Sequence, residues 1–253
     1  MIRRGERKTV ERVTIPVLQQ MKREGRKIVG VVAWDYQIAQ IADRAGVDLI
    51  SVGDSVGMNL WGHATDTEVT VDEILICCKA VRRGAKRPLV SCDVPNGPAQ
   101  AGTEAAVSAA VRLAKEGGAD MVKVLGDPSV VKAIVRAGVP VFAEFHGEKL
   151  PVDKLVDEAK RLEDAGASVL DFRHSGPSAG PAVVRAVSIP VIGGLGGGPW
   201  LDGRVRLAHT AIGYAAKWID AKTETYGNAA KLSLDAFRAL IDDVRSGRQI
   251  KGG

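Results

Sequence analysis

The sequence has few aromatic residues, few cysteines and no long uninterrupted apolar segment. Aromatic side chains make up only 4% of the 253 residues. No run of eighteen apolar residues occurs, so we expect no membrane span, and the N-terminus lacks the apolar core of a signal peptide. Three cysteines, Cys77, Cys78 and Cys92, do not make a disulfide framework. We expect packed thiols in a reducing, cytoplasmic setting.

The chain also lacks a strong charge imbalance. Lysine and arginine number 35 against 30 acidic residues, a formal net charge of +5. The basic residues gather in three short runs, 3–8, 22–27 and 82–87, which are typical of solvated helix ends and turns. We therefore expect a small-molecule ligand, and neither a nucleic-acid nor a membrane partner.

Apolar segments of strand type alternate with amphipathic, helix-type segments along the chain. Continuous apolar strands are buried on both faces, which is typical of parallel sheets. The expected strands are 27–33, 47–52, 88–92, 121–125, 139–145, 168–172, 189–193 and 210–215. Eight strand–helix units in about 250 residues predict a TIM (β/α)8 barrel. A doubly wound α/β sheet is the main alternative.

We expect one domain over residues 1–253. Residues 1–25 are expected to form an arm and a helix that starts at Thr14-Ile15-Pro16, because Thr can cap a helix and Pro is tolerated in its first turn. Near the other end, 201–208 is expected to be a short helix and 229–246 a long helix that closes the barrel.

Polar and charged residues stand where the expected strands end. Asp54 and Ser55 follow the apolar segment 47–52 and are flanked by Gly53. The carboxyl ends of barrel strands open on one face, where active sites collect. That face is expected to gather Asp54, Ser55, Asp93, Lys123, Glu144, His146, Asp171, Arg173 and His174.

Asp54 and Asp93 come from neighbouring strands and predict a Mg²⁺ site. Mg²⁺ takes one or two carboxylates and completes its shell with water and substrate oxygens. Lys123, one strand further round, could balance a substrate carboxylate or the charge on an enolate. Taken alone, Asp54 could equally cap the next helix.

Other candidate ligand groups leave two interpretations open. The glycine-rich segment 193–198 could cradle a phosphate after the seventh strand, or form a tight turn beside the mouth. Pro199 stands where a GxGxxG fingerprint would need its last glycine. His63 and His209 could be metal ligands or hydrogen-bonded structural residues.

Several motifs resemble those of the ketopantoate hydroxymethyltransferases (3-methyl-2-oxobutanoate hydroxymethyltransferases). The motifs are Val52–Met58, Gly62-His63, Val69–Val71, Ala80–Ala85, Asp93 with Pro95, Ala119–Lys123, Ile189–Gly193 and Asp202-Gly203 with His209. The resemblance runs from about Thr14 to about Val244. Its Val-Gly-Asp-Ser and Met-Val-Lys motifs are fairly specific in combination.

This resemblance implies a TIM barrel related to phosphoenolpyruvate mutase and isocitrate lyase. It implies that Mg²⁺, or another divalent metal, holds a 2-oxo acid as its enolate, which attacks the one-carbon unit of methylenetetrahydrofolate. Asp54 and Asp93 would then be metal ligands, and Gly53, Ser55 and Lys123 would contact the oxo acid. A homo-oligomer is implied too, because family members form large rings of subunits, decamers included.

Three positions depart from the family's pattern. Leu125 stands where the family has a glutamate near the metal, and Ala143-Glu144 replaces a Gly-His pair, with His146 two residues further on. Counting back without gaps from Ile189-Pro190, Arg173 occupies the position of the catalytic glutamate. Arginine cannot accept a proton near neutral pH. The base would have to be Asp171, Glu144, His146 or His174.

The residues and the resemblance together favour an enzyme of 2-oxo acid enolate chemistry. The reaction would be hydroxymethyl transfer or a related aldol-type C–C bond formation or cleavage, on an altered substrate, because Arg173 could grip a second carboxylate. One alternative is a C–C or P–C lyase resembling phosphoenolpyruvate mutase and isocitrate lyase, for which Arg173 would suit a phosphonate. Another is a barrel that has lost catalysis.

Overall fold

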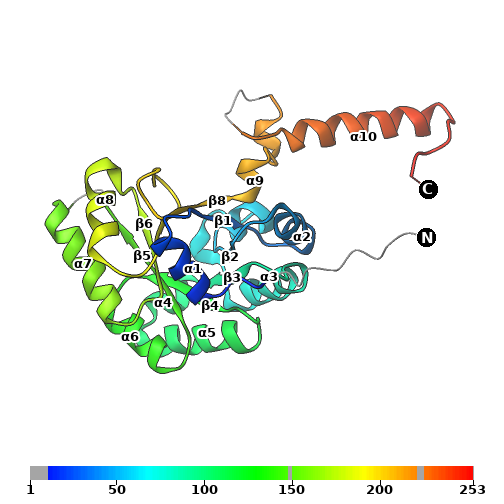
Figure 1. The fold of residues 1–253 in the computed structure, drawn as a ribbon. Coiled ribbons are helices and arrows are strands. Elements are labelled where there is room, and N and C mark those ends of the chain that lie inside the picture. Colours follow the sequence, from blue (N-terminus) through cyan, green and yellow to red (C-terminus); the bar gives the residue numbers. More distant parts are fainter. Residues whose placement is uncertain (1–10, 148–149, 221–224, 253) are drawn as a thin grey trace, which may run out of the picture. The chain divides into compact units, whose positions relative to one another are not determined.

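The computed structural model describes residues 11–147, 150–220 and 225–252. Within them, eight parallel strands form a closed barrel in the order β1 to β8 (Figure 1). The strands are β1 (Ile28–Val32), β2 (Leu49–Val52), β3 (Leu89–Asp93), β4 (Met121–Leu125), β5 (Val141–His146), β6 (Val169–Arg173), β7 (Val191–Gly193) and β8 (Gly203–Leu207). The TIM-barrel prediction is confirmed. The first ten residues of the expected arm lie outside the described residues.

Helices follow the strands around the barrel. They are α1 (Ile15–Arg23), α2 (Tyr36–Ala45), α3 (Val71–Gly84), α4 (Asn96–Gln100), α5 (Thr103–Lys115), α6 (Pro128–Arg136), α7 (Val152–Asp164) and α8 (Gly176–Ala186). Some of these helices begin or end with a recognisable cap. The Asp35 side chain accepts the N–H of Ile38 at the start of α2, and Gly46 ends that helix with a φ of 88°. Thr70 and Glu73 form a capping box at the start of α3.

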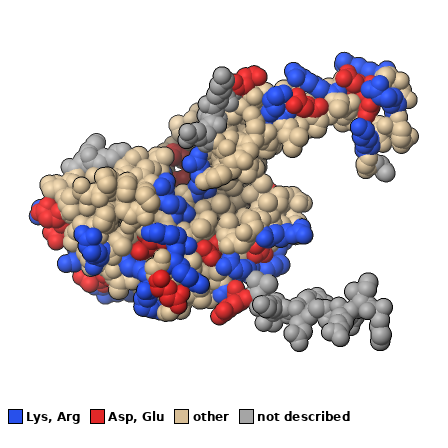
Figure 2. All heavy atoms as spheres, turned by 45° about the horizontal axis from the view of Figure 1, so that its top comes forward, with Lys and Arg blue, Asp and Glu red and all other residues tan. Residues whose placement is uncertain are grey.

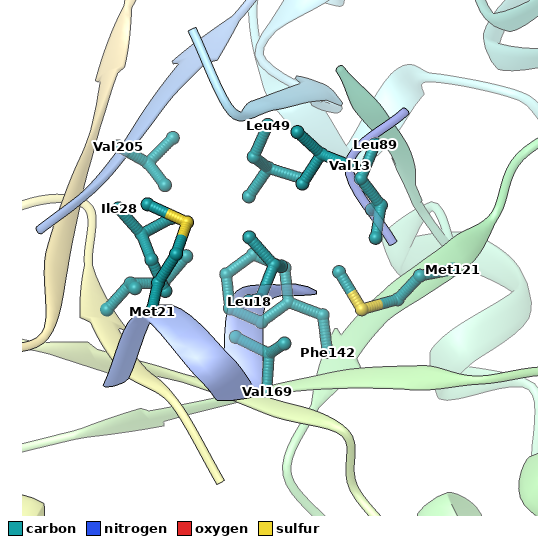
Figure 3. Packing of buried hydrophobic residues seen from close by; sticks show 11 residues of the cluster. Val13, Leu18, Met21, Ile28, Leu49, Leu89, Met121, Phe142, Val169 and Val205 are labelled. Atoms are coloured by element: carbon teal, nitrogen blue, oxygen red, sulfur yellow. The ribbon is translucent and has the colours of Figure 1, made fainter. Parts of the chain in front are cut away.

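An apolar cluster fills the amino end of the barrel. Residues at or near the start of each strand point inward there: Ile28, Leu49, Leu89, Met121, Phe142, Val169, Ile192 and Val205 (Figure 3). Leu18 and Met21 of α1 pack into the same cluster, together with Val13. Leu18 is completely buried. The helix predicted to start near Thr14 is thus confirmed, and it plugs this end of the barrel.

Three aspartates at the amino end have matched partners. Asp48, Asp120 and Asp202 directly precede strands β2, β4 and β8 or lie within one residue of them. Each carboxylate accepts one backbone N–H from the preceding strand, at 2.8–3.0 Å, and pairs with a basic side chain. The partners are Val29 and Arg87 for Asp48, Val90, Arg82 and Arg12 for Asp120, and Val191 and Lys22 for Asp202. These three carboxylates are thus compensated within the described part of the protein.

The last strand differs from the prediction. We expected a helix over 201–208 and a strand over 210–215, and both expectations are wrong. Strand β8 runs over Gly203–Leu207 and the short helix α9 over Ala208–Ala211. Val205 points into the core between exposed Arg204 and Arg206. This alternation of period two indicates a strand, but the flanking polar residues conceal it.

Residues 206–253 form a second unit, separate from the unit that ends at Val205. It contains α9, a 3-10 turn (Ala216–Trp218) and the long helix α10 (Ala229–Arg245). The His209 ring stacks on Trp218 with centroids 6.1 Å apart. Helix α10 exposes Leu232, Phe237, Leu240, Ile241 and Val244. The domain boundaries predicted from the sequence, and the closing role of this helix, stay predictions.

Burial of the thiols, surface charge and helix hydrophobicity can be compared with the expectations from composition. Cys77, Cys78 and Cys92 are buried free thiols, as predicted. On the face drawn in Figure 2, acidic side chains are interspersed among the basic ones, and no continuous positive stripe is visible. None of the described helices is both long and apolar enough to cross a membrane.

Candidate active site

Strand alternation places the predicted charged residues inside the carboxyl end of the barrel. Met121, Phe142 and Val169 point inward at the amino end. The inward residues two positions later on the same strands are Lys123, Glu144 and Asp171. The register pairs Asp93 with Lys123 and Glu144 with Asp171 across neighbouring strands. The structure therefore brings these four side chains together, and Arg173 and His146 form the next pair outward.

Lys123 is the centre of this group. Its Nζ lies 2.6 Å from Glu144 Oε2, 3.2 Å from Asp171 Oδ2 and 3.8 Å from Asp93 Oδ2. Burial lowers the pKa of Lys123, but the three carboxylates outweigh this effect and hold the pKa above its ordinary value. Lys123 is therefore a permanent cation in the site. Its Nζ also lies 5.9 Å from the centre of the Phe142 ring.

Glu144 binds three groups at once. Besides Lys123, its carboxylate accepts a hydrogen bond of 2.6 Å from Arg173 Nη1 and lies 3.0 Å from His146 Nε2. Burial raises the pKa of Glu144, but Lys123 and Arg173 outweigh it and lower the pKa to about 2. Glu144 is therefore an ionised anchor at neutral pH, and it is too weak a base to accept a substrate proton.

Arg173 is held by this anchor and still has donor capacity. Burial lowers the pKa of Arg173, but the Glu144 carboxylate outweighs this effect and the net pKa is raised. The guanidinium therefore stays charged. The Nε–H of Arg173 is buried and has no hydrogen-bond partner within the described residues. A buried donor without a partner is costly, and a ligand oxygen would relieve that cost.

Asp93 and Asp54 are the poorly compensated carboxylates. Burial raises the pKa of Asp93 to about 7, with further contributions from Asp54 and Glu144, although Lys123 opposes the shift. Burial also raises the pKa of Asp54. Their side-chain hydrogen bonds are long: Ser51 Oγ lies 3.4 Å from Asp93, and Asn96 Nδ2 lies 3.5 Å from Asp54. Lys123 Nζ is 3.8 Å from Asp93, the longest of its three ion pairs.

The charge count in the site favours a divalent cation. Asp54, Asp93, Glu144 and Asp171 supply four negative charges, and Lys123 and Arg173 supply two positive ones, a surplus of two negative charges. The described residues contain no cluster of three or more His, Cys, Asp or Glu side chains arranged to hold a metal. Mg²⁺ needs only one or two carboxylates when water and substrate fill its other positions. Asp54 and Asp93 fit that requirement.

Asp171 is fixed by the loop after β7. Its Oδ1 accepts the N–H of Gly194 at 2.9 Å, and its other oxygen pairs with Lys123. At least one amide of the glycine-rich segment 193–198 is therefore occupied by the protein itself. Gly196 has a φ of 69°, which indicates a turn. The phosphate-cradle interpretation gains no support from these contacts.

Two histidines lie beside the ion cluster. The rings of His146 and His174 stack with centroids 6.4 Å apart. His174 directly follows β6 and has a φ of 51°, an uncommon conformation for a residue with a side chain. A side chain on Gly196 would lie only 2.6 Å from His174 Nδ1. The turn and the strained residue thus fix the position of the His174 ring.

Other predicted residues vary in their relation to the cluster. A side chain on Gly53 would lie 3.4 Å from Asp93 Oδ2 and 3.3 Å from Ser55 Oγ, so Gly53 and Ser55 border the carboxylates. Leu125 is 66% exposed. His63 is apart from this group, with its Nε2 3.4 Å from Glu73.

Three neighbours of the site were not predicted from the sequence. Ser51 and Ser91 are buried beneath Asp93, with their hydroxyls 3.5 Å apart, and Trp34 donates its indole N–H to the carbonyl of Gly53. The two serines share the inward alternation of Leu49 and Leu89, which precede them by two residues. That spacing could have identified them, whereas nothing in the sequence signals the Trp34 contact.

Comparison with protein families gives a match over nearly the whole chain. A family model described as ketopantoate hydroxymethyltransferase matches residues 12–147 and 144–249. The 3-methyl-2-oxobutanoate hydroxymethyltransferase of Cyanothece sp. is 36% identical, with 92% of this chain and 97% of that protein covered. The enzyme of the same name from Moorella thermoacetica is also 36% identical, with 94% and 95% covered.

Solved structures are similar in fold. A phosphonopyruvate hydrolase in complex with oxalate and Mg²⁺ has a TM-score of 0.63 and 17% identity, covering 92% of this chain and 88% of that one. A 2,3-dimethylmalate lyase, described as a member of the PEP mutase/isocitrate lyase superfamily, has a TM-score of 0.60 and 14% identity, covering 94% and 89%. At these identities the similarity extends to the barrel fold alone.

Proposed function

The chain belongs to the ketopantoate hydroxymethyltransferase family and is an enzyme, and on this premise we propose that it performs metal-dependent enolate chemistry on a 2-oxo acid. The reaction is hydroxymethyl transfer, or a related aldol-type formation or cleavage of a C–C bond. The substrate differs from 3-methyl-2-oxobutanoate. The observation that carries the proposal is the charge balance at the barrel mouth. Four carboxylates there face only two cations, Lys123 and Arg173, and three of the carboxylates contact Lys123.

Asp54 and Asp93 would hold the divalent metal, with Mg²⁺ as the first choice for carboxylate ligands. Phosphonopyruvate hydrolase, which has the same fold, binds Mg²⁺ together with oxalate. When bound, the cation supplies a Lewis acid that polarises the substrate's oxo group. It would also neutralise the two poorly compensated carboxylates, whose pKa values are raised in its absence.

Lys123 would lie against the oxo acid and stabilise negative charge that develops on its oxygen. Its charge is permanent and its position is fixed by Glu144 and Asp171. A cation that is already in place needs no reorganisation during the reaction. Gly53 and Ser55 would contact the oxo acid, because both lie beside the Asp93 carboxylate.

Arg173 would determine the substrate. The family's catalytic glutamate would leave room for an uncharged substrate tail, whereas Arg173 presents a cation with an unpartnered buried Nε–H. Guanidinium groups bind carboxylates and phosphonates through paired hydrogen bonds. We therefore expect a second anionic group on the native substrate, which 3-methyl-2-oxobutanoate lacks.

The test is a substrate comparison at saturating Mg²⁺. Wild-type enzyme is assayed with methylenetetrahydrofolate and either 3-methyl-2-oxobutanoate or a panel of 2-oxo diacids and 2-oxo phosphonates, and products are identified by NMR. Turnover should favour a dianionic substrate. Arg173→Lys keeps the positive charge but loses the paired N–H donors of the guanidinium, so it should reduce that preference. Turnover of 3-methyl-2-oxobutanoate at about 1 s⁻¹ or faster would contradict the altered substrate.

A second candidate is a C–C or P–C lyase acting on a dianionic 2-oxo acid or its adduct. The same unpartnered Nε–H of Arg173 favours it, because a phosphonate or a second carboxylate would fill that position. The assay separates the two candidates, since a lyase cleaves its substrate without methylenetetrahydrofolate. The homo-oligomeric state and the cytoplasmic location expected from the sequence stay predictions.

A further inference from the structure

We propose that His146 is the proton acceptor of this site and that Glu144 is its positioning residue. The inference rests on the proposed function, which requires a base that removes a proton from the carbon next to the oxo group. Arg173 occupies the position where the family keeps that base. The replacement must therefore come from another side chain at the mouth, close to Arg173.

The other candidates on strands β5 and β6 are already occupied. Glu144 is bound by Lys123 and Arg173 at 2.6 Å each and stays ionised as a weak base. Asp171 accepts the Gly194 N–H through one oxygen and pairs with Lys123 through the other. Glu144 is stabilised as an anion by its two partners, and both oxygens of Asp171 are already engaged by protein groups.

The contact between His146 and Glu144 fixes the protonation pattern of the imidazole. An ionised carboxylate can only accept hydrogen bonds, so His146 Nε2, at 3.0 Å, must donate. In the neutral ring the lone pair is then on Nδ1. A carboxylate that orients an imidazole and stabilises the imidazolium is the arrangement that makes histidine an effective base.

The position of His146 suits the role. The strand register pairs His146 with Arg173, so the two residues share the same level of the mouth. The base would thus have moved by one strand, from β6 to β5. The His146 side chain is 43% exposed. An accepted proton can therefore pass to water, and the stacked His174 ring limits the motion of the imidazole.

The step conserves atoms and charge. The C–H bond next to the oxo group breaks and its proton goes to His146 Nδ1. The bonding electron pair forms the C=C bond of the enolate, and the electron pair of the C=O bond moves to oxygen. The imidazolium, held by Glu144, later loses the proton to water. In D₂O the imidazole returns deuterium to the same carbon, so exchange reports the step without any one-carbon donor.

The experiment measures deuterium exchange at the carbon next to the oxo group by NMR, with full-length protein, Mg²⁺ and the 2-oxo acids of the substrate comparison. His146→Gln keeps an N–H donor for Glu144 and removes the base. Exchange should fall by about 10²- to 10⁴-fold, the usual contribution of general base catalysis. Binding of the 2-oxo acid, measured by calorimetry, should change less than about threefold, because the contact with Glu144 is retained.

Two further variants sharpen the test. His146→Ala should lose exchange in the same way and regain part of it when free imidazole is added, because the exposed position leaves a path for the small base. A purely structural role would show no such rescue. His174→Asn, which suits the left-handed backbone at that position, should lower exchange less than His146→Gln does.

The outcomes separate the two proposals. Unchanged exchange in His146→Gln, or a larger loss in His174→Asn, would overturn the assignment of His146 while the proposed function stands. Absence of exchange in the wild-type protein with every 2-oxo acid tested would overturn the proposed function and this inference with it.

Discussion

The two ends of the barrel use charge in opposite ways. At the amino end, Asp48 and Asp202 each have one backbone N–H and one basic partner, and Asp120 has one backbone N–H and two basic partners, Arg12 and Arg82, beside an apolar cluster covered by α1. At the carboxyl end, Asp93, Glu144 and Asp171 share Lys123, and Glu144 also pairs with Arg173. The same strands form both ends. The carboxylates of the amino end are paired within the protein, whereas those of the carboxyl end outnumber their cationic partners by two, and we propose that a bound cation and a ligand balance them.

The largest expected effect concerns Asp93. Asp93→Asn should lower activity by about 10³-fold or more and weaken Mg²⁺ or Mn²⁺ binding, because a bound cation contributes several kcal/mol to charge stabilisation. Isothermal calorimetry measures the affinity. Asp120→Asn is the matched control at the amino end: it should cost stability and leave metal affinity unchanged. Equal metal affinities in Asp93→Asn and wild type would remove the proposed metal site.

Leu18→Ala tests the amino end. Leu18 is completely buried in the apolar cluster, so truncation should reduce the free energy of unfolding by about 2–5 kcal/mol. Urea denaturation measures this value. Metal affinity of the folded variant should stay at the wild-type level. Ile41→Ala, at a residue 62% exposed on α2, serves as the control and should change stability by about 0.5 kcal/mol or less. A comparable loss of unfolding free energy in both variants would contradict the packing role of Leu18 at the amino end of the barrel.

Lys123→Ala should lower turnover and substrate affinity together, by about 2–4 kcal/mol. The reason is that Lys123 contacts three of the four carboxylates, those of Asp93, Glu144 and Asp171. Steady-state kinetics and calorimetry with the 2-oxo acid measure the two quantities. Lys132→Ala, an exposed position on α6, is the control. Wild-type kinetics in Lys123→Ala would end the assignment of this residue to the site.

The smallest expected effect is a pH-dependent difference in stability. The folded pKa of Glu144, about 2, lies below its ordinary value of 4.5, so its ion pairs stabilise the fold above pH 4.5 and lose this contribution as the pH falls towards 2. Glu144→Gln should cost about 1.5–3 kcal/mol near neutral pH. Urea denaturation at several pH values should show the gap to wild type closing in acid. A stability difference between Glu144→Gln and wild type that is constant with pH would contradict the stabilising role of these ion pairs. Glu104→Gln, at an exposed position, is the control.

Much of this architecture can be predicted from the sequence. Strands buried on both faces appear as continuous apolar segments, and their alternation with helix-type segments gives the order of the barrel. Strand β8 was missed because only Val205 is apolar within Gly203–Arg206. The positions of Asp93, Lys123 and Asp171 at one mouth follow from strand ends and alternation. The pairing of Arg173 with Glu144 does not, because residues 29 positions apart meet only through the register of β5 and β6.

The ion pair between Arg173 and Glu144 also constrains the mutational paths open to this sequence. By the resemblance, two of the three departures from the family's pattern fall on this pair, with a glutamate at the position of Arg173 and a histidine at that of Glu144. Exchanging Arg173 alone for glutamate would set two carboxylates against each other with Lys123 as their one counter-ion, and exchanging Glu144 alone would strip the guanidinium of its anion. Each single exchange would leave one charge of the pair without its partner, so we expect the effects of the two exchanges on stability to be non-additive.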